Sequence, residues 1–151
     1  MEAAMWTTTH QATTSAPIDA VWAALEALHH GEPLGPASDH FELHGPFAVG
    51  TTVTVTPQGQ DPLDSVIVDL EPGRHYADQT VFGDLTLTFR HVLTPTDDGG
   101  THVRHTLVVE GPGSDEIGPE LGPQIAGDFP VTMDELFAAA ARRAATADAT
   151  G

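Results

Sequence analysis

Three histidines, His10, His91 and His105, stand where strand alternation predicts an inward-facing side chain. An imidazole titrates near neutral pH, so it can give or take a proton in catalysis. Three imidazoles can also hold a zinc ion and leave one position open. Alternatively, each is a partly buried histidine hydrogen-bonded within the protein. We take the three as catalytic candidates and predict neither a metal site nor a cofactor, because a three-histidine zinc site also needs residues that hold the imidazoles by hydrogen bonds, and the sequence identifies none.

Tyr76, the only tyrosine, shares one face of a predicted strand with Asp78 and Thr80. Its hydroxyl can orient a carbonyl or phenol oxygen of a ligand. The alternative is ordinary packing of an amphipathic ring on a sheet. Four apolar residues join Tyr76 as candidates for ligand contact: Phe89 on a strand, and Ile125, Phe129 and Met133 on the last helix.

A second cluster, His40-x-Glu42-x-His44, places three metal-ligating side chains on one face of a strand. Phe41 and Leu43 claim the opposite face for the core. We therefore expect the three polar side chains to face solvent on an edge strand, where charge discourages pairing with other chains.

The elements that must position these residues follow from hydrophobic periodicity. Residues 6–14 are rich in threonine and predict a strand. Pro17 fits the first position of a helix. The residues that follow, Ile18, Val21, Trp22, Leu25 and Leu28, form one apolar stripe at helical spacing.

Residues 39–112 alternate with a period of two and contain Pro-Gly, Gly-Asp and Asp-Asp-Gly-Gly turns. This pattern is typical of about six antiparallel strands in a meander. From Ser114, apolar residues recur every three to four positions and predict one long amphipathic helix, capped by Ser114 and kinked near Pro130. Residues 145–151 are predicted to be a disordered tail.

Only the two helical segments can cover the apolar face of such a sheet. We therefore predict an α+β fold in a single domain, residues 1–144, with the order strand, helix, six strands, helix. A curved sheet gripping a long helix leaves a space between them, and that space is the natural ligand site.

Composition excludes several functions. Asp and Glu total 22 against five basic residues, all of them arginine, which gives a formal net charge of −17. Such a field repels phosphate backbones, so we expect no nucleic-acid partner. No cysteine is present. No apolar run is long enough to cross a membrane, and the first ten residues do not resemble a secretory signal, so we expect a cytoplasmic protein with no membrane span.

Four segments together resemble the START-like (SRPBCC) superfamily, in particular its polyketide cyclase/dehydrase-like subgroup. They are "TTSAPIDAVWAAL", "GPFAVGTTVTVTPQG", "VDLEPGRHYADQT" and "GPQIAGDFPVTMDELFAAAAR", and the resemblance covers about residues 6 to 143. It implies a helix-grip fold, in which about seven antiparallel strands wrap around a long C-terminal helix and enclose a cavity. Superfamily members include polyketide aromatase/cyclases, lipid-transfer domains, hormone receptors and many bacterial proteins. They share no universal catalytic residue, so the resemblance assigns no active site.

The first strand departs from the family's usual pattern. It carries Thr8 and His10 where relatives often have aliphatic side chains, so we expect a more polar cavity than that of a lipid-transfer tunnel. The first strand should lie beside the last in this arrangement, and the last beside the one before it, which lets the three histidines converge.

Three functional hypotheses follow. In the first, the protein binds a small hydrophobic or aromatic ligand, polyketide-like or lipid-like, in its cavity and catalyses acid–base cyclisation or dehydration of that ligand. The second is a non-catalytic carrier, sensor or stress-response binding protein. The third is an interaction protein with a vestigial cavity. The sequence leaves the choice between enzyme and binder open, and it leaves the oligomeric state open with a homodimer as one option.

Overall fold

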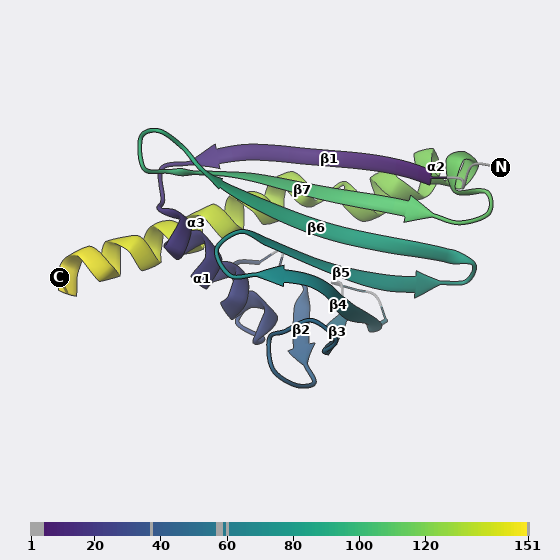
Figure 1. Ribbon diagram of the computed structural model, residues 1–151, viewed down its shortest axis with the longest axis horizontal. Helices are drawn as coiled ribbons and strands as arrows, with labels where there is room; N and C mark the ends of the chain where they lie inside the picture. The colour runs from purple at the N-terminus through teal and green to yellow at the C-terminus, as the bar shows by residue number, and fades with distance from the viewer. Residues whose placement is uncertain (1–4, 37, 57–58, 60, 151) are drawn as a thin grey trace.

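The computed structural model describes residues 5–36, 38–56, 59 and 61–150, with the backbone alone for residues 146–150. Seven strands and three helices are found in these residues (Figure 1). In chain order they are β1 (Met5–Thr14), α1 (Ile18–His29), β2 (His40–Leu43), β3 (Thr52–Thr56), β4 (Leu63–Glu71), β5 (His75–Phe82), β6 (Leu85–Pro95), β7 (Thr101–Glu110), α2 (Ser114–Ala126) and α3 (Phe129–Thr150).

The strands form one antiparallel sheet in the order β1-β7-β6-β5-β4-β3-β2. The first strand thus lies beside the last, and the meander runs from there to the short edge strand β2. In Figure 1, α2 and α3 lie behind the sheet and α1 lies near its lower strands. The predicted helix-grip fold is confirmed.

Alternation along the strands divides the sheet into an inner and an outer face. On β7, for example, Val103, His105, Leu107 and Val109 are buried, whereas Arg104 between them is exposed. The inner face packs in two clusters. One joins α1 and α3 through residues such as Leu25 and Leu136. The other lies nearer α2 and includes Leu87, Leu107 and Phe129.

The C-terminal segment differs from the prediction of one continuous helix. It is broken at residues 127–128 into α2 and α3. Pro130 lies in the first turn of α3, so the break has the expected origin: a proline has no N–H to donate to the preceding turn. α3 continues to Thr150. Residues 145–150, predicted to be a disordered tail, are therefore helical in the structure, and residue 151 lies outside the described residues.

Both predicted helix starts differ from the structure by one residue: α1 begins one residue later than predicted, and α2 one residue earlier. Pro17 precedes α1 as its N-cap, with ψ of 156°, and its carbonyl accepts the N–H groups of Ala20 and Val21. Ser114 does not cap α2, because the cap position is held by Gly113 at φ 76°, a left-handed conformation that favours glycine. Ser114 is fully buried instead.

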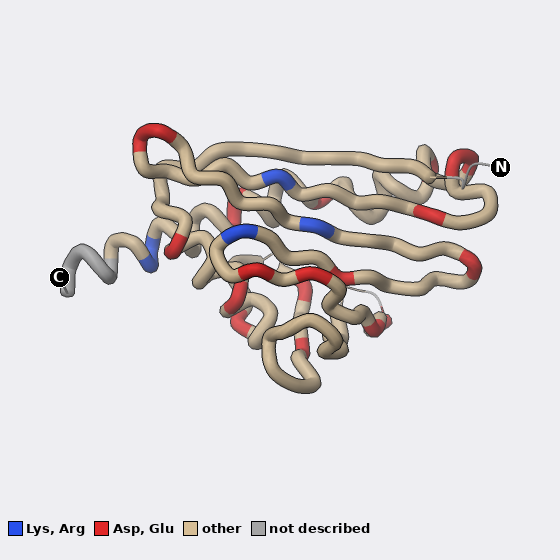
Figure 2. The backbone as a smooth tube through the Cα atoms, viewed as in Figure 1, with Lys and Arg blue, Asp and Glu red and all other residues tan. Residues whose placement is uncertain are grey.

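Charge is distributed unevenly over this fold. Figure 2 shows acidic segments spread over many turns and strand ends, whereas basic segments are few. Arg90 on the outer face of β6 forms an ion pair with Asp69, with 2.6 Å between Nη1 and Oδ2. At the far end of α3, Arg142 donates to the Leu34 carbonyl oxygen and Arg143 pairs with Glu32.

Candidate functional site

A row of polar side chains crosses the inner face of four neighbouring strands. The sheet register pairs Tyr76 with His91, His91 with His105, and His105 with His10. On β6 and β7 the neighbouring inward positions are apolar: Phe89 pairs with Leu107 on one side and Leu93 with Val103 on the other. The structure therefore brings the three predicted histidines into one row, with Tyr76 at its end.

Ring contacts hold the centre of this row. The His91 and His105 rings stack with centroids 3.8 Å apart and 22° between their planes. On its other side His105 stacks on Phe129, at 3.7 Å and 19°. His105 is 8% exposed and lies between the two rings. Phe129 begins α3, so the helix break described above positions the ring that holds His105.

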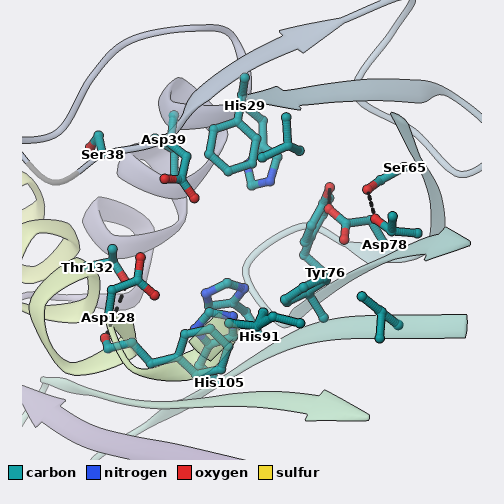
Figure 3. Close-up of a pocket in the computed structure, with 18 of the residues that line it drawn as sticks. His29, Ser38, Asp39, Ser65, Tyr76, Asp78, His91, His105, Asp128 and Thr132 are labelled. Atoms are coloured by element: carbon teal, nitrogen blue, oxygen red, sulfur yellow. Dashed lines mark hydrogen bonds between the residues drawn. The ribbon is translucent and has the colours of Figure 1, made fainter. Parts of the chain in front are cut away.

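The row forms part of the wall of a cavity of about 370 Å³ between the sheet and the helices. Figure 3 shows Tyr76 and Asp78 on one side of it, Asp39, Asp128 and Thr132 on the other, and His91 and His105 between them. Apolar side chains supply much of the remaining wall. All five predicted ligand-contact residues line it: Tyr76, Phe89, Ile125, Phe129 and Met133.

Two of the three catalytic candidates, His91 and His105, line the cavity, whereas His10 does not. His10 lies beyond His105 on β1, partly exposed. Any influence of His10 on a bound ligand would therefore pass through His105.

Burial decides how these imidazoles titrate. It lowers the pKa of His91 to about 3, with a smaller contribution from His29. Burial likewise holds the pKa of His105 well below its ordinary value, and nearby His91 and His10 lower it further. The expectation of imidazoles that titrate near neutral pH does not hold for these two. Both are neutral at pH 7, and each carries one N–H donor and one acceptor nitrogen.

Tyr76 and Asp78, both on the inner face of β5, form a hydrogen-bonded pair. The Tyr76 hydroxyl donates to Asp78 Oδ2 at 2.7 Å. Tyr76 is 1% exposed and Asp78 is 5% exposed. Burial raises the pKa of Asp78 to about 6, although the Tyr76 hydrogen bond acts in the opposite direction. Burial also raises the pKa of Tyr76 above its ordinary value, so the hydroxyl keeps its proton.

His29, at the end of α1, is a cavity residue that the sequence did not single out. Its Nδ1 lies 2.7 Å from the Leu25 carbonyl oxygen, and its ring packs on Tyr76 with centroids 4.3 Å apart. Burial lowers its pKa to about 4. A histidine in the last turn of a helix can hydrogen-bond the free carbonyl groups there. This preference is the one feature of the sequence that could have pointed to His29.

Asp78, Ser65 and Thr80 are the other polar residues of this wall that were not predicted as site residues. The Ser65 and Thr80 hydroxyls are hydrogen-bonded to each other, and both are buried. Alternation along the strand puts Asp78 and Thr80 on the same face as Tyr76, so the sequence predicts the face of the sheet on which their side chains lie. Their burial could not be predicted in the same way, because it depends on the tertiary fold around them.

Metal ligation finds no support among the described residues, where no group of three or more His, Asp or Glu side chains is arranged to hold an ion. His40 and Glu42 are exposed on the edge strand β2, as expected, and His44 lies just beyond it with its Nε2 2.7 Å from Thr54 Oγ1. Within the described part of the chain, no helix is long and apolar enough to span a membrane.

Solved structures show the same fold at low sequence identity. A point mutant of norcoclaurine synthase from Thalictrum flavum, in complex with a transition state analogue, superposes with a TM-score of 0.74 at 13% identity, covering 95% of this chain and 98% of its own. The ZhuI aromatase/cyclase from Streptomyces sp. R1128 gives 0.72 at 18% identity, covering 93% and 96%. Protein MLL2253 from Mesorhizobium loti gives 0.67 at 22% identity, covering 91% and 98%.

Among curated proteins there is no significant sequence match. A family assignment does emerge from the sequence itself, over nearly its whole length and over every element described above. Residues 5–147 match the family described as "Polyketide cyclase / dehydrase and lipid transport". The chain therefore belongs to this polyketide cyclase/dehydrase and lipid transport family, whose fold is one for binding hydrophobic ligands.

Proposed function

We propose that this protein binds a small hydrophobic or aromatic ligand, polyketide-like or lipid-like, in the cavity beneath α3, and that it catalyses acid–base cyclisation or dehydration of that ligand. The observation that carries the proposal is a row of ring side chains, Tyr76, His91 and His105, in the wall of a cavity whose remaining lining combines many apolar side chains with several polar ones such as Asp78. Such a combination binds a mostly apolar molecule and fixes the position of one polar group on it.

The size of the cavity supports a small-molecule ligand. About 370 Å³ falls within the usual range of pockets for such molecules. Its apolar side chains come from both layers, with Phe89 on the sheet and Phe129 and Met133 on the helix. A flat aromatic or short aliphatic body between these layers would gain free energy by leaving water.

The polar row supports recognition of an oxygen atom. Neutral imidazoles at His91 and His105 can each donate one N–H to a carbonyl or phenol oxygen. His91 Nδ1 is buried without a hydrogen-bond partner among the described residues, and the His105 ring lies against His91 in the cavity wall. An oxygen that gains negative charge during proton transfer would be stabilised by fixed donors of this kind.

The family supports chemistry as well as binding. Its description includes cyclases and dehydrases, and the ZhuI structure with the same fold is an aromatase/cyclase. Lipid transport is part of the same description. A carrier that binds without reaction is therefore the second candidate, and the apolar share of the wall favours it.

The binding claim is tested by thermal shift and calorimetry with 2-naphthol and with palmitate as probes. We expect one of them to bind at one site per chain and to raise the melting temperature. Ile125→Trp places a large side chain in the cavity wall and should abolish that binding. Ile117→Trp, on the same helix at a position that is 40% exposed, is the matched control and should bind normally. Absence of binding, or equal binding by both variants, would contradict the proposal.

The catalytic claim is tested by mass spectrometry of an aromatic β-hydroxy ketone incubated with the protein. Loss of 18 mass units, dependent on protein and abolished by Ile125→Trp, would indicate dehydration. A probe that binds and is recovered unchanged would favour the carrier. If nothing binds, the remaining hypothesis is an interaction protein whose cavity has no ligand.

A further inference from the structure

Asp78 is a carboxylate in the cavity wall with no basic residue beside it. It lies on the inner face of β5, 5% exposed, directly across from Phe89 on β6. The one hydrogen bond that the structure describes for its side chain comes from the Tyr76 hydroxyl at 2.7 Å. A carboxylate this deeply buried is normally paired with a cation or held by several donors, because removing its charge from water is costly.

The basic residues of the chain lie elsewhere. All five are arginines, and none lines the cavity. Arg90 is paired with Asp69 on the outer face of the sheet, Arg74 is exposed just before β5, and Arg104 is exposed on the outer face of β7. Arg142 and Arg143 reach the segment after α1. The protein thus keeps a weakly compensated carboxylate in the wall of its cavity, which is an arrangement expected of a reacting group.

The electrostatic environment gives this carboxylate the properties of a general base. Burial raises the pKa of Asp78 to about 6, so it is ionised at pH 7 and still more basic than an ordinary aspartate. The buried imidazoles are much weaker bases, since burial lowers the pKa of His91 to about 3. The cavity therefore separates two tasks. Asp78 is suited to accept a proton, and the imidazoles are suited to donate hydrogen bonds.

The tautomer of His91 fits the second task. Its Nδ1 is buried without a hydrogen-bond partner among the described residues. Buried N–H groups without a partner are rarer in proteins than buried acceptors without one, so we place the proton on Nε2. An Nε2–H group then remains for a ligand oxygen.

We propose that Asp78 is the catalytic base of this cavity, and that it takes a proton from a carbon next to a ligand carbonyl whose oxygen accepts hydrogen bonds from His91 and His105. This inference rests on the proposed function, because it needs a carbonyl ligand in the cavity. Tyr76 acts as a positioning residue: its hydroxyl fixes the orientation of the Asp78 carboxylate.

The chemistry balances without a cofactor or an oxidant. The C–H bond breaks, its proton goes to the Asp78 carboxylate, and its electron pair forms an enolate held at the two imidazoles. In a dehydration, that pair then forms the carbon–carbon double bond as the bond to the β-hydroxyl group breaks. The proton on Asp78 goes to the leaving hydroxide, water departs, and the carboxylate is regenerated. In a cyclisation, the enolate carbon bonds to a second carbonyl carbon, and the same proton goes to its oxygen.

Proton abstraction can be measured without the natural ligand. The probe is 2-tetralone, an aromatic ketone, and the measurement is the rate at which its acidic protons exchange for deuterium in D₂O, followed by NMR. We expect the protein to accelerate exchange above the buffer rate, with a rate that rises with pH and levels off above an inflection near pH 6. Asp78→Asn should lower the accelerated rate about a hundredfold or more.

Three further variants separate a catalytic role from a structural one. Tyr76→Phe removes the hydrogen bond that lowers the pKa of Asp78, so the inflection should move to higher pH. His105→Gln should lower the plateau rate and leave the inflection in place. Asp97→Asn removes one carboxylate from the exposed turn between β6 and β7 and is the matched control; its rate should equal that of the native protein.

Two results would overturn the assignment. One is a folded Asp78→Asn variant, checked by circular dichroism, that exchanges 2-tetralone at the native rate. The other is native protein that binds 2-tetralone in calorimetry without accelerating exchange; it would remove Asp78 as base while the binding function stands. Failure of 2-tetralone, 2-naphthol and palmitate all to bind would instead overturn the proposed function and this inference with it.

Discussion

His91 and His105 occupy directly paired positions on β6 and β7, and their rings stack with centroids 3.8 Å apart. Two imidazoles in such contact cannot both be charged without strong repulsion. The contact is therefore compatible with the fold only while at least one of the two rings is neutral, and this links the shape of the cavity wall to pH.

We expect acid to destabilise the protein through its buried histidines. Burial lowers the pKa of His29 to about 4 and that of His91 to about 3. Below pH 6.5 the unfolded chain therefore binds more protons than the folded one, and the free energy of unfolding falls as pH falls toward these values. The loss should be at most about 2 kcal/mol for each of the two imidazoles between pH 6.5 and 5. Urea unfolding at the two pH values measures it.

His91→Phe is the test of this assignment, because it keeps a ring in the stack and removes the titrating group. The drop in stability between pH 6.5 and 5 should be smaller in this variant than in the native protein. An equal drop would show that other groups cause it.

Asp78→Asn should make the protein more stable at a pH where Asp78 is ionised. Burial raises the pKa of this carboxyl from 3.8 to about 6, so the folded state binds more protons than the unfolded chain between these values and loses stability as pH rises through them. At pH 8 the full cost is present, about 3 kcal/mol. The amide carries no charge, and its oxygen can still accept from Tyr76, so urea unfolding at pH 8 should show the variant to be more stable by up to that amount.

Asp97→Asn again supplies the comparison. In a chain with a net charge of −17, loss of any carboxylate relieves some repulsion. The effect of burial is therefore the increase in the free energy of unfolding caused by Asp78→Asn minus the increase caused by Asp97→Asn. Equal gains would mean that Asp78 is better solvated than its 5% exposure indicates.

The close packing of α2 on β1 depends on two glycines of α2, Gly118 and Gly122, that lie against the ring of Trp6 on β1. A Cβ atom at Gly122 would lie 2.0 Å from Trp6 Cη2, and one at Gly118 would lie 2.3 Å from Trp6 Cγ. Gly→Ala in a helix normally adds up to about 1 kcal/mol of stability. Here we expect Gly122→Ala to cost about 1–3 kcal/mol, because the ring or the helix must move.

A double-mutant cycle with Trp6→Leu identifies the cause of that loss. The smaller side chain leaves room for the methyl group, so Gly122→Ala should cost much less in the Trp6→Leu background. Additive effects in denaturant unfolding would place the cause elsewhere in α2.

Sequence patterns were sufficient to predict the sheet and the histidine row, for a physical reason. Side chains alternate between faces with a period of two, so a run such as Leu85 to Leu93 fixes which residues point inward. The superfamily resemblance supplied the remaining step, that β1 lies beside β7. Together they place His10, His91 and His105 on adjacent strands of one face, and the register of the sheet then aligns them.

The same patterns could not predict how the row behaves. The pKa values of His91 and Asp78 depend on their burial in the folded protein, which local periodicity does not contain. His29 lies at the end of α1, one residue beyond the apolar stripe from Ile18 to Leu28, and its packing on Tyr76 requires the tertiary fold. The break at residues 127–128 was foreseen only as a kink near Pro130.

Phe129 links this break to the site, and replacing it should change both stability and ligand size preference. The ring is 5% exposed and stacks on His105 at 3.7 Å. Phe129→Ala should therefore cost about 3–5 kcal/mol in urea unfolding. It also enlarges the cavity beside His105, so a three-ring phenol such as 9-phenanthrol should gain affinity relative to 2-naphthol, measured by calorimetry. Phe129→Leu keeps most of the volume and should leave that ratio near its native value. If the ratio is unchanged in Phe129→Ala, the ligand does not occupy the space between α3 and the histidine row.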